Sequence, residues 1–214
     1  MSTKPKTSDR GTIAALRGGN LVRAALDQVN DGGLESLTMR RLAERLGTHL
    51  PTIYRLYADK DALLDDMAES ILASALASRD PDATEWSARA RRLATGLRSA
   101  LLAQRDGARI VGGNYAAKRN NLSFVDTLVG CMRDARLPGE TALWSASTVF
   151  CFVLGEALEQ QGAGGDEVGV LLDAVSMGGF HHLSASPVQH LFDFDARFDF
   201  GLELILGGVR RYTA

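Results

Sequence analysis

Apolar and polar positions in this chain recur with the period of an α-helix along most of its length. From Asn20, a candidate helix cap, apolar residues repeat at helical spacing until Gly32 and Gly33. Longer stripes of the same kind occupy residues 63–76, 86–101, 118–135, 138–161 and 194–209. No segment alternates apolar and polar residues as a half-buried strand would. The pattern therefore predicts an all-α protein.

Residues 38–60 predict two short helices around a tight turn. Thr38 can cap the first helix, which has its apolar residues on one face and Arg40 and Arg41 on the other. Gly47 can take the left-handed conformation that ends a helix, and Pro51 is tolerated in the first turn of the next one. This is the pattern of a helix-turn-helix DNA reader. The alternative is an ordinary helical hairpin with a solvated basic face.

In the second of these helices, Ile53 and Tyr57 lie four residues apart and are predicted to point inward. The side chains predicted to point outward, toward a DNA major groove, are Leu50, Thr52, Tyr54 and Arg55.

The chain divides into an arm and two helical domains. Residues 1–19 form a basic N-terminal arm or a disordered tail, and residues 20–66 form a three-helix DNA-binding domain. Residues 67–214 form a larger helical domain, joined to the reader by a helix that Asp59 caps and that ends near Ser78. The polar run 79–84, with Pro81, predicts a linker. A short helix is expected from Gly107 to Tyr115.

The stretch from Leu37 to Tyr54, followed by Tyr57 and residues 60–64, closely resembles the DNA-binding domain of the TetR family of bacterial transcriptional regulators. Further matches look like the tetracycline-repressor branch of that family and lie at residues 101–102, 105–108, 154–155, 158–159 and 200–205. The resemblance implies a DNA-binding domain plus a ligand-binding and dimerisation domain.

The resemblance places the DNA contacts at Thr38, Arg40, Leu50, Pro51, Thr52, Tyr54, Arg55 and Lys60. Arg40 and Arg55 suit a guanine edge, Thr52 and the apolar faces of Leu50 and Pro51 suit a thymine methyl, and Tyr54 and Lys60 suit phosphates. His49 stands where many relatives have a serine cap, and Leu50 where the tetracycline repressor has a polar reader. The operator sequence therefore does not carry over.

The same resemblance implies an effector pocket that differs from that of the tetracycline repressor. Val111 stands where that protein has a magnesium-coordinating histidine, so an oxygen-rich magnesium site would lose its first protein ligand. Other positions matching its drug contacts hold Leu76, Leu93, Leu97 and Thr127, and Glu159 alone keeps its type. We therefore expect a largely hydrophobic effector and no metal or cofactor.

Further polar or aromatic contacts to this effector are expected from Asn114, Tyr115, Trp144, Phe150 and His181. For each of them, packing in the protein core is the alternative interpretation.

The helices over 138–161 and 194–209 are apolar on more than one side, which is more than one small domain can cover. A second copy of the chain is the simplest cover, and in the resembled family the two helices form a dimer interface. A two-fold dimer would read a near-palindromic site in double-stranded DNA.

Composition agrees with a soluble regulator. The chain has 214 residues, of which 45% are hydrophobic, so it can bury a sizeable core. Residues 1–60 hold ten Lys or Arg against six Asp or Glu, a balance of +4, and residues 61–214 hold fourteen against twenty, a balance of −6. The positive N-terminal part favours phosphate contact. Neither a signal peptide nor a later membrane span is expected, so we place the chain in the cytoplasm.

Other chemistries find weaker support. Cys131 and Cys151 lie in apolar helical contexts without CxxC spacing, which favours buried thiols over a redox pair. The histidines at 181, 182 and 190 have no nearby ligand to complete a metal site, and the sequence lacks the context of a serine hydrolase around Ser184 and Ser186. The rival hypothesis is a ligand-binding or enzymatic helical dimer that does not read DNA. The predicted groove-facing residues Arg40, Thr52, Tyr54 and Arg55 and the positive N-terminal charge argue against it.

Overall fold

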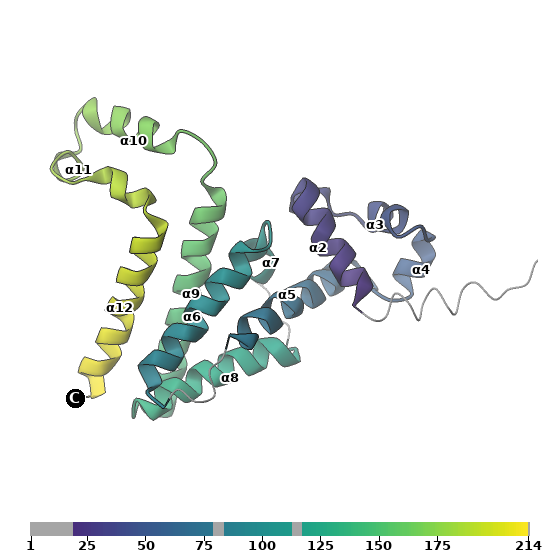
Figure 1. Ribbon diagram of the computed structural model, residues 1–214, viewed down its shortest axis with the longest axis horizontal. Helices are drawn as coiled ribbons and strands as arrows, with labels where there is room; N and C mark the ends of the chain where they lie inside the picture. Colours follow the sequence, from purple (N-terminus) through teal and green to yellow (C-terminus); the bar gives the residue numbers. More distant parts are fainter. Residues whose placement is uncertain (1–18, 79–83, 113–116, 214) are drawn as a thin grey trace, which may run out of the picture.

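The computed structural model describes residues 19–78, 84–112 and 117–213, and over these residues it consists of helices and turns without a strand (Figure 1). The all-α prediction is thus confirmed for the described part of the chain. Most of the expected basic arm, most of the 79–84 linker, and Asn114 and Tyr115 lie outside it.

The N-terminal unit contains α2 (Asn20–Gly32), the 3-10 turn η1 (Leu34–Ser36), α3 (Met39–Arg45) and α4 (Leu50–Tyr54). Its core includes the fully buried Leu21, Val29, Leu42 and Ile53. The sequence predicted Asn20 as the cap of this helix, but Asn20 is the first residue of α2. Gly19 takes the N-cap position instead, with φ of 84°, a conformation that glycine adopts without strain.

The helix α5 (Lys60–Ala77) links this unit to the rest of the molecule. As predicted, the side chain of Asp59 caps it by accepting a hydrogen bond from the Ala62 amide at 2.8 Å. Leu63 and Met67 are fully buried near its start, and Leu72 near its end. Both ends of α5 therefore pack into the hydrophobic core. In Figure 1 the helix runs from the N-terminal unit, the DNA reader, into the rest of the molecule, the body.

The body contains α6 (Trp86–Leu102), α7 (Gly107–Val111), α8 (Arg119–Asp134) and α9 (Gly139–Gly162). α5 packs against α6, α7 and α8, and α9 packs against α6, α7, α8 and α12. The expected helix to Tyr115 is shorter than predicted, because α7 ends at Val111 and Gly112 takes an extended conformation.

After α9 the chain forms an arm of α10 (Glu167–Ser176), α11 (His181–Ser184) and η2 (Val188–Phe192), which leads into α12 (Phe194–Thr213). Figure 1 shows the arm projecting beyond the end of α9, and α12 returning along it. The sequence did not predict helices in the arm. His181 and His182 are exposed on α11.

Arginines of α6 pair with acidic side chains of neighbouring helices. Arg89 pairs with Asp134 of α8, and Arg91 pairs with Glu203 of α12. Arg98 lies 2.7 Å from Asp195, and its guanidinium stacks over the Phe198 ring. These arginines therefore tie α6 to α8 and α12. A helical-period pattern cannot distinguish a solvated charge from one that faces an acidic neighbour.

The helix α9 corrects the expectation that no segment approaches a membrane span. It has 24 residues and a mean hydropathy of 1.4 over 18 of them, so its length and composition would allow a crossing. A core helix of a soluble protein can pass the same test, and one face of α9 is buried, with Ala142, Val149 and Val153 at its centre. The opposite face remains exposed and is described below.

Candidate DNA-binding and effector sites

The turn between α3 and α4 holds the two helices of the reader at a fixed angle. The Thr38 hydroxyl caps α3 by accepting a hydrogen bond from the Arg41 amide at 3.2 Å, as predicted. Gly47 has φ of 61°, which confirms it as the residue that ends α3, and the Thr48 amide donates to the Ala43 carbonyl at 2.9 Å. Pro51 occupies the first turn of α4, where its missing N–H costs nothing.

One narrow face of α4 is open to solvent. Pro51, Tyr54 and Arg55 are exposed, and positions i, i+3 and i+4 share one side of a helix. On α3 the Arg40 side chain is 82% exposed, with its Nε 3.1 Å from Glu44. Thr38 is exposed and Lys60 half-buried at the start of α5. The structure thus leaves most of the predicted DNA contacts accessible.

Two of the predicted outward residues are wrongly oriented in the sequence-based interpretation. Thr52 is only 4% exposed, and Leu50 is half-buried against the core. The reason is the length of α4, which has five residues and packs against α3. Thr52 and Ile53 are both buried, so the inner side of this short helix includes both positions. A thymine contact from Thr52 would need its side chain to reach the surface.

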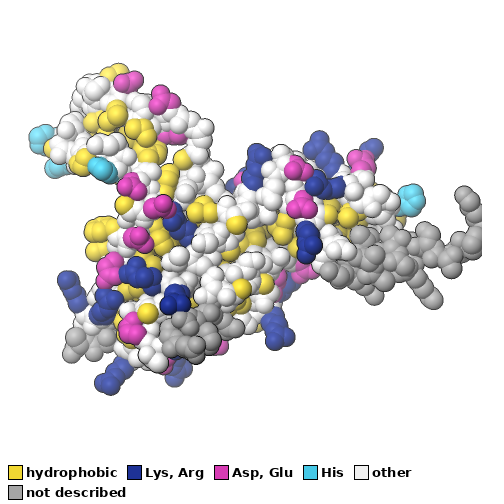
Figure 2. Space-filling view, in the orientation of Figure 1, with side chains coloured by type: hydrophobic (Ala, Val, Ile, Leu, Met, Phe, Trp, Pro, Cys, Tyr) yellow, Lys and Arg dark blue, Asp and Glu magenta, His cyan; other side chains and the backbone are white. Residues whose placement is uncertain are grey.

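Figure 2 shows Lys and Arg side chains on the end of the molecule formed by α2, α3 and α4, among a few acidic ones. Arg45 is bound there to Asp31 at 2.6 Å, and the other arginines of α3 are exposed. A second group of basic side chains lies toward α6 and α12, where carboxylates of α8 and α12 neutralise several of them. The reader therefore presents an exposed basic surface.

A hydrogen-bonded joint that sequence patterns did not predict lies where the reader meets the body. The Tyr57 hydroxyl donates to Asp66 Oδ2 at 2.7 Å, and Lys118 Nζ lies 2.6 Å from Asp66 Oδ1. Partial burial would raise the pKa of Asp66, but the hydrogen bonds from Lys118 and Tyr57 outweigh it and lower that pKa. Burial and the bond to Asp66 raise the pKa of Tyr57. The partners are 52 and 9 residues from Asp66, so no local spacing could reveal them.

The predicted effector residues do not come together in one site. Leu93, Leu97 and Val111 are at most 3% exposed and belong to the closed core of the body. Leu76 and Thr127 are half-buried, and the Thr127 hydroxyl donates back to the Ser123 carbonyl at 2.6 Å. These residues line none of the grooves described below. Asn114 and Tyr115 lie outside the described residues.

Trp144 and Phe150 do come together, in a groove of about 350 Å³ between α8 and α9. This α8–α9 groove is apolar, and its walls are formed by Val125, Leu128, Leu143, Trp144, Ala146, Ser147 and Phe150. The Phe150 ring lies 5.8 Å from that of Phe124, and the Trp144 side chain is 59% exposed. The groove lacks a carboxylate or imidazole lining residue, so its chemistry suits an apolar or aromatic molecule.

Glu159 and His181 lie away from that groove. Glu159 is 67% exposed and 3.8 Å from Arg197, in a wide groove between α9 and the arm. His181 is exposed on α11, where its ring lies 5.5 Å from that of His182. Across the described residues, no three His, Cys, Asp or Glu side chains are grouped as they would be around a metal ion.

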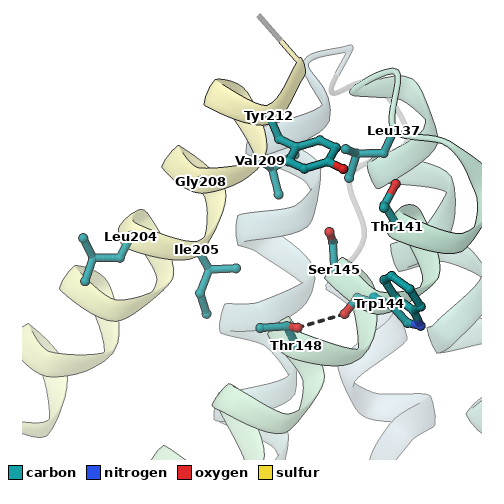
Figure 3. A pocket seen from close by; sticks show the side chains of 10 residues that line it. All are labelled: Leu137, Thr141, Trp144, Ser145, Thr148, Leu204, Ile205, Gly208, Val209 and Tyr212. Carbon is teal, nitrogen blue, oxygen red and sulfur yellow. Dashed lines mark hydrogen bonds between the residues drawn. The ribbon is translucent and has the colours of Figure 1, made fainter.

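A second apolar groove, between α9 and α12, is drawn in Figure 3. Ser145 and Thr148 of α9 face Ile205 and Tyr212 of α12 across it, and Trp144 and Leu204 line its edges. Exposed large hydrophobic residues continue along both helices, with Leu143 and Leu158 on α9 and Phe200 on α12. We call this surface the α9–α12 face. The sequence predicted it from the apolar excess of the two helices.

The cysteines are both free. Cys131 is buried in α8, and burial raises the pKa of its thiol, which disfavours the reactive thiolate. Cys151 is exposed on α9, contrary to the expectation that both thiols are buried. Its exposure has the same origin as that of Trp144 and Leu158, because all three lie on the open side of α9.

An exposed basic helix-turn-helix joined by one long helix to a helical body with apolar grooves defines a DNA-binding regulator with a separate sensing domain. Comparison with known proteins agrees. The family model for bacterial regulatory proteins of the tetR family matches residues 21–67, and the model for tetracycline repressor-like C-terminal domains matches residues 80–212. The chain belongs to the tetR family of transcriptional regulators, which disfavours the rival hypothesis of a dimer that does not read DNA.

The tetracycline repressor protein class C of Escherichia coli is 36% identical over 196 residues, 89% of each chain. The crystal structure of a possible TetR family transcriptional regulator from Streptomyces coelicolor A3(2) superposes with a TM-score of 0.82 at 40% identity, covering 91% of this chain and 98% of that one. ActR of Streptomyces coelicolor in complex with actinorhodin superposes with a TM-score of 0.77 at 31% identity, covering 89% and 93%.

Proposed function

We propose that this regulator is a homodimeric repressor that leaves its operator when a largely hydrophobic small molecule enters the body. The observation that carries the proposal is the pairing of an open, basic α4 face with an apolar groove in a separate domain, joined by the continuous helix α5. We assign DNA binding to residues 20–66 and ligand binding and dimerisation to residues 67–214. The chain would act by binding alone, without catalysis, in the cytoplasm.

For DNA, the proposed contacts are the accessible residues Thr38, Arg40, Pro51, Tyr54, Arg55 and Lys60. Arg40 and Arg55 would donate to guanine edges, and Tyr54 and Lys60 would hold phosphates. The named relative is itself a repressor, which supports repression as the direction of control.

For the effector, the α8–α9 groove is the proposed entrance. Its volume of about 350 Å³ lies in the range of small-molecule sites, and its walls are apolar. The buried Leu93, Leu97 and Val111 would form the inner wall once a ligand widens the space. ActR binds actinorhodin on the same fold, which supports a small organic ligand here without identifying it.

The dimer is proposed from the α9–α12 face. Leu158, Phe200 and Leu204 are each about half exposed or more, which is more apolar surface than a lone soluble chain usually exposes on one face. A second copy related by a two-fold axis would cover it and place two α4 helices on one side.

Selection of bound sequences from a random DNA pool tests this function. We expect a near-palindromic site whose half-sites lie about one DNA turn, roughly 34–36 Å, or a multiple of it apart. A protein that enriches no sequence while remaining folded would contradict the proposal.

A further inference from the structure

A chain of hydrogen bonds links the end of α9 to the DNA reader without passing through α5. It begins at Gln161 in the last turn of α9. The Gln161 amide nitrogen donates to the Leu101 carbonyl at 2.9 Å and to the Gln104 carbonyl at 2.7 Å. Its amide oxygen accepts from the Ala108 amide at 3.1 Å. One side chain therefore uses its donors and its acceptor on the backbone of the turn between α6 and α7.

Residues of this turn also form hydrogen bonds with α2. Gln104 is only 7% exposed, and its amide nitrogen donates to Asn30 Oδ1 at 2.8 Å and to the Leu26 carbonyl at 3.1 Å. The Arg105 amide donates to the same Asn30 oxygen at 2.9 Å. Arg105 also reaches the carbonyl of Asp31 at 3.4 Å. The Asp31 carbonyl belongs to the last turn of α2, where a helix leaves acceptors unsatisfied and favours positive charge.

Two more bonds hold η1, the segment directly after α2. Asp106 Oδ2 accepts from the Leu34 amide at 2.8 Å, and Arg109 joins Glu35 at 2.5 Å. The turn itself has little freedom, because a Cβ on Gly107 would lie 2.2 Å from the Leu101 carbonyl oxygen. We call this set, from Gln161 through the turn to α2 and η1, the clamp.

We propose that Gln161 and Gln104 are positioning residues that set the distance between the two recognition helices of the dimer, and so the half-site spacing that the protein accepts. The inference rests on the dimer proposed above, in which α9 lies at the interface. The clamp is then a direct path from the interface to each reader. A buried amide without its partner is unfavourable, so a rotation of α2 that breaks the Gln104 bonds is opposed.

The helix α5 and the clamp attach the reader to the body at different places. α5 packs against α6, α7 and α8, whereas the clamp bonds α2 and η1. Loss of the clamp would leave α2 held through α5 and the core, and free to tilt. Because both readers move relative to the two-fold axis, a tilt changes the spacing between them and leaves each α4 surface intact.

The experiment selects DNA from a pool in which two copies of the preferred half-site are separated by spacers of varied length. Gln161→Met and Gln104→Met keep side-chain size and remove the hydrogen bonds. Gln160→Met is the matched control, since Gln160 is adjacent in α9 and bonds only Arg98 in the described residues, at 2.7 Å. Light scattering and thermal melting verify that each variant is a folded dimer. Gln161→Glu, which keeps the acceptor for Ala108 and loses both donors, replaces Gln161→Met if that variant does not fold.

We expect the wild type and Gln160→Met to prefer one spacing, and both clamp variants to lose roughly threefold or more of that preference, the effect of about one hydrogen bond. The double variant should lose no more than either single one, because both residues act along one path. Equal weakening at every spacing, or an unchanged preference, would overturn the clamp while leaving the proposed function intact. A wild type that selects no paired half-sites would overturn the proposed function and the clamp with it.

Discussion

At the scale of single residues, the reading surface depends on how few side chains a five-residue helix can expose. Pro51, Tyr54 and Arg55 share the open face of α4, and the adjacent Thr52 and Ile53 are buried. Arg55 is the only one of the three exposed residues with a planar, charged donor, and such a fork can bond both acceptors of a guanine edge. Sequence discrimination at this face should therefore depend on Arg55 more than on its neighbours.

We expect Arg55→Ala to weaken specific DNA binding by about 1–3 kcal/mol and to relax sequence preference at one base pair, the effect of losing a bidentate guanine contact. Competition binding with single-base variants of the site measures both effects. Arg133→Ala serves as the control, because it removes an equal charge from an exposed position on α8. Unchanged affinity and preference in Arg55→Ala would show that α4 is not the reader.

Lys60→Ala should behave differently from Arg55→Ala. A lysine that contacts a phosphate does not distinguish one base from another, so we expect Lys60→Ala to weaken binding to all DNA sequences equally. The slope of log affinity against log salt concentration should become shallower by about 0.9, the value for one phosphate contact. A variant with an unchanged slope would place Lys60 away from the DNA.

The joint of Tyr57, Asp66 and Lys118 gives a pH dependence of stability. The pKa of Asp66 is lower in the folded chain than its usual value, so its stabilising contribution is present at neutral pH and is lost as the pH falls through that lowered pKa. We expect Tyr57→Phe to reduce the free energy of unfolding by about 1 kcal/mol at neutral pH and by less at about pH 3. Urea unfolding at both pH values measures this, with Tyr54→Phe as an exposed control away from the α9–α12 face. An equal loss at both pH values would show that the contribution of Tyr57 to stability does not depend on the charge of Asp66.

Residue-level features could be predicted from sequence where their partners are local. Thr38 and Asp59 were predicted as caps because a cap bonds an amide three residues ahead. The orientation of Thr52 was wrong because it depends on where α4 ends and on α3 beside it. The bonds of Gln104 to α2 and of Gln161 to the turn cross 53 to 78 residues, and nothing in the local sequence indicates them.

At the scale of elements, the α9–α12 face decides the oligomeric state. Leu204 is 61% exposed on α12 and lines the groove shared with α9. A charge introduced there would be buried without a partner on dimerisation, which is strongly unfavourable.

We expect Leu204→Glu to yield a monomer at micromolar concentration and to abolish binding to paired half-sites. Leu122→Glu is the matched control, since Leu122 is 56% exposed on α8 and lies outside the grooves described here. Light scattering compares the two variants with the wild type. A Leu204→Glu protein that remains dimeric would move the interface away from this face.

Among elements, the long helices were predicted and the arm was not. α6, α8, α9 and α12 each carry several turns of apolar repeat, so their period is unambiguous. α10, α11 and η2 are short and largely exposed, with apolar residues such as Val170, Met177 and Phe180 on their surface. Their structure depends on neighbours more than on a local pattern. The sequence likewise could not predict that the expected pocket residues are buried in the core, because a leucine in a core and a leucine lining a pocket give the same apolar pattern.

At the scale of the whole molecule, the proposed function requires α5 to couple the effector groove to the DNA reader. An effector can weaken DNA binding only if it binds the non-DNA conformer more tightly, and about 1.4 kcal/mol of differential affinity gives a tenfold effect. An apolar ligand gains roughly 25 cal/mol for each Å² of apolar surface covered, before the costs of binding. A groove lined by Trp144, Phe150 and leucines can supply that gain to an apolar ligand, and it offers little to a charged chelate.

The most direct test titrates the complex of the protein and its selected operator with a panel of compounds, with and without magnesium. We expect release by apolar or aromatic molecules, unaffected by magnesium, and a weaker response in Phe150→Ala than in the wild type. Release by a magnesium–tetracycline chelate and by no apolar compound would contradict the account.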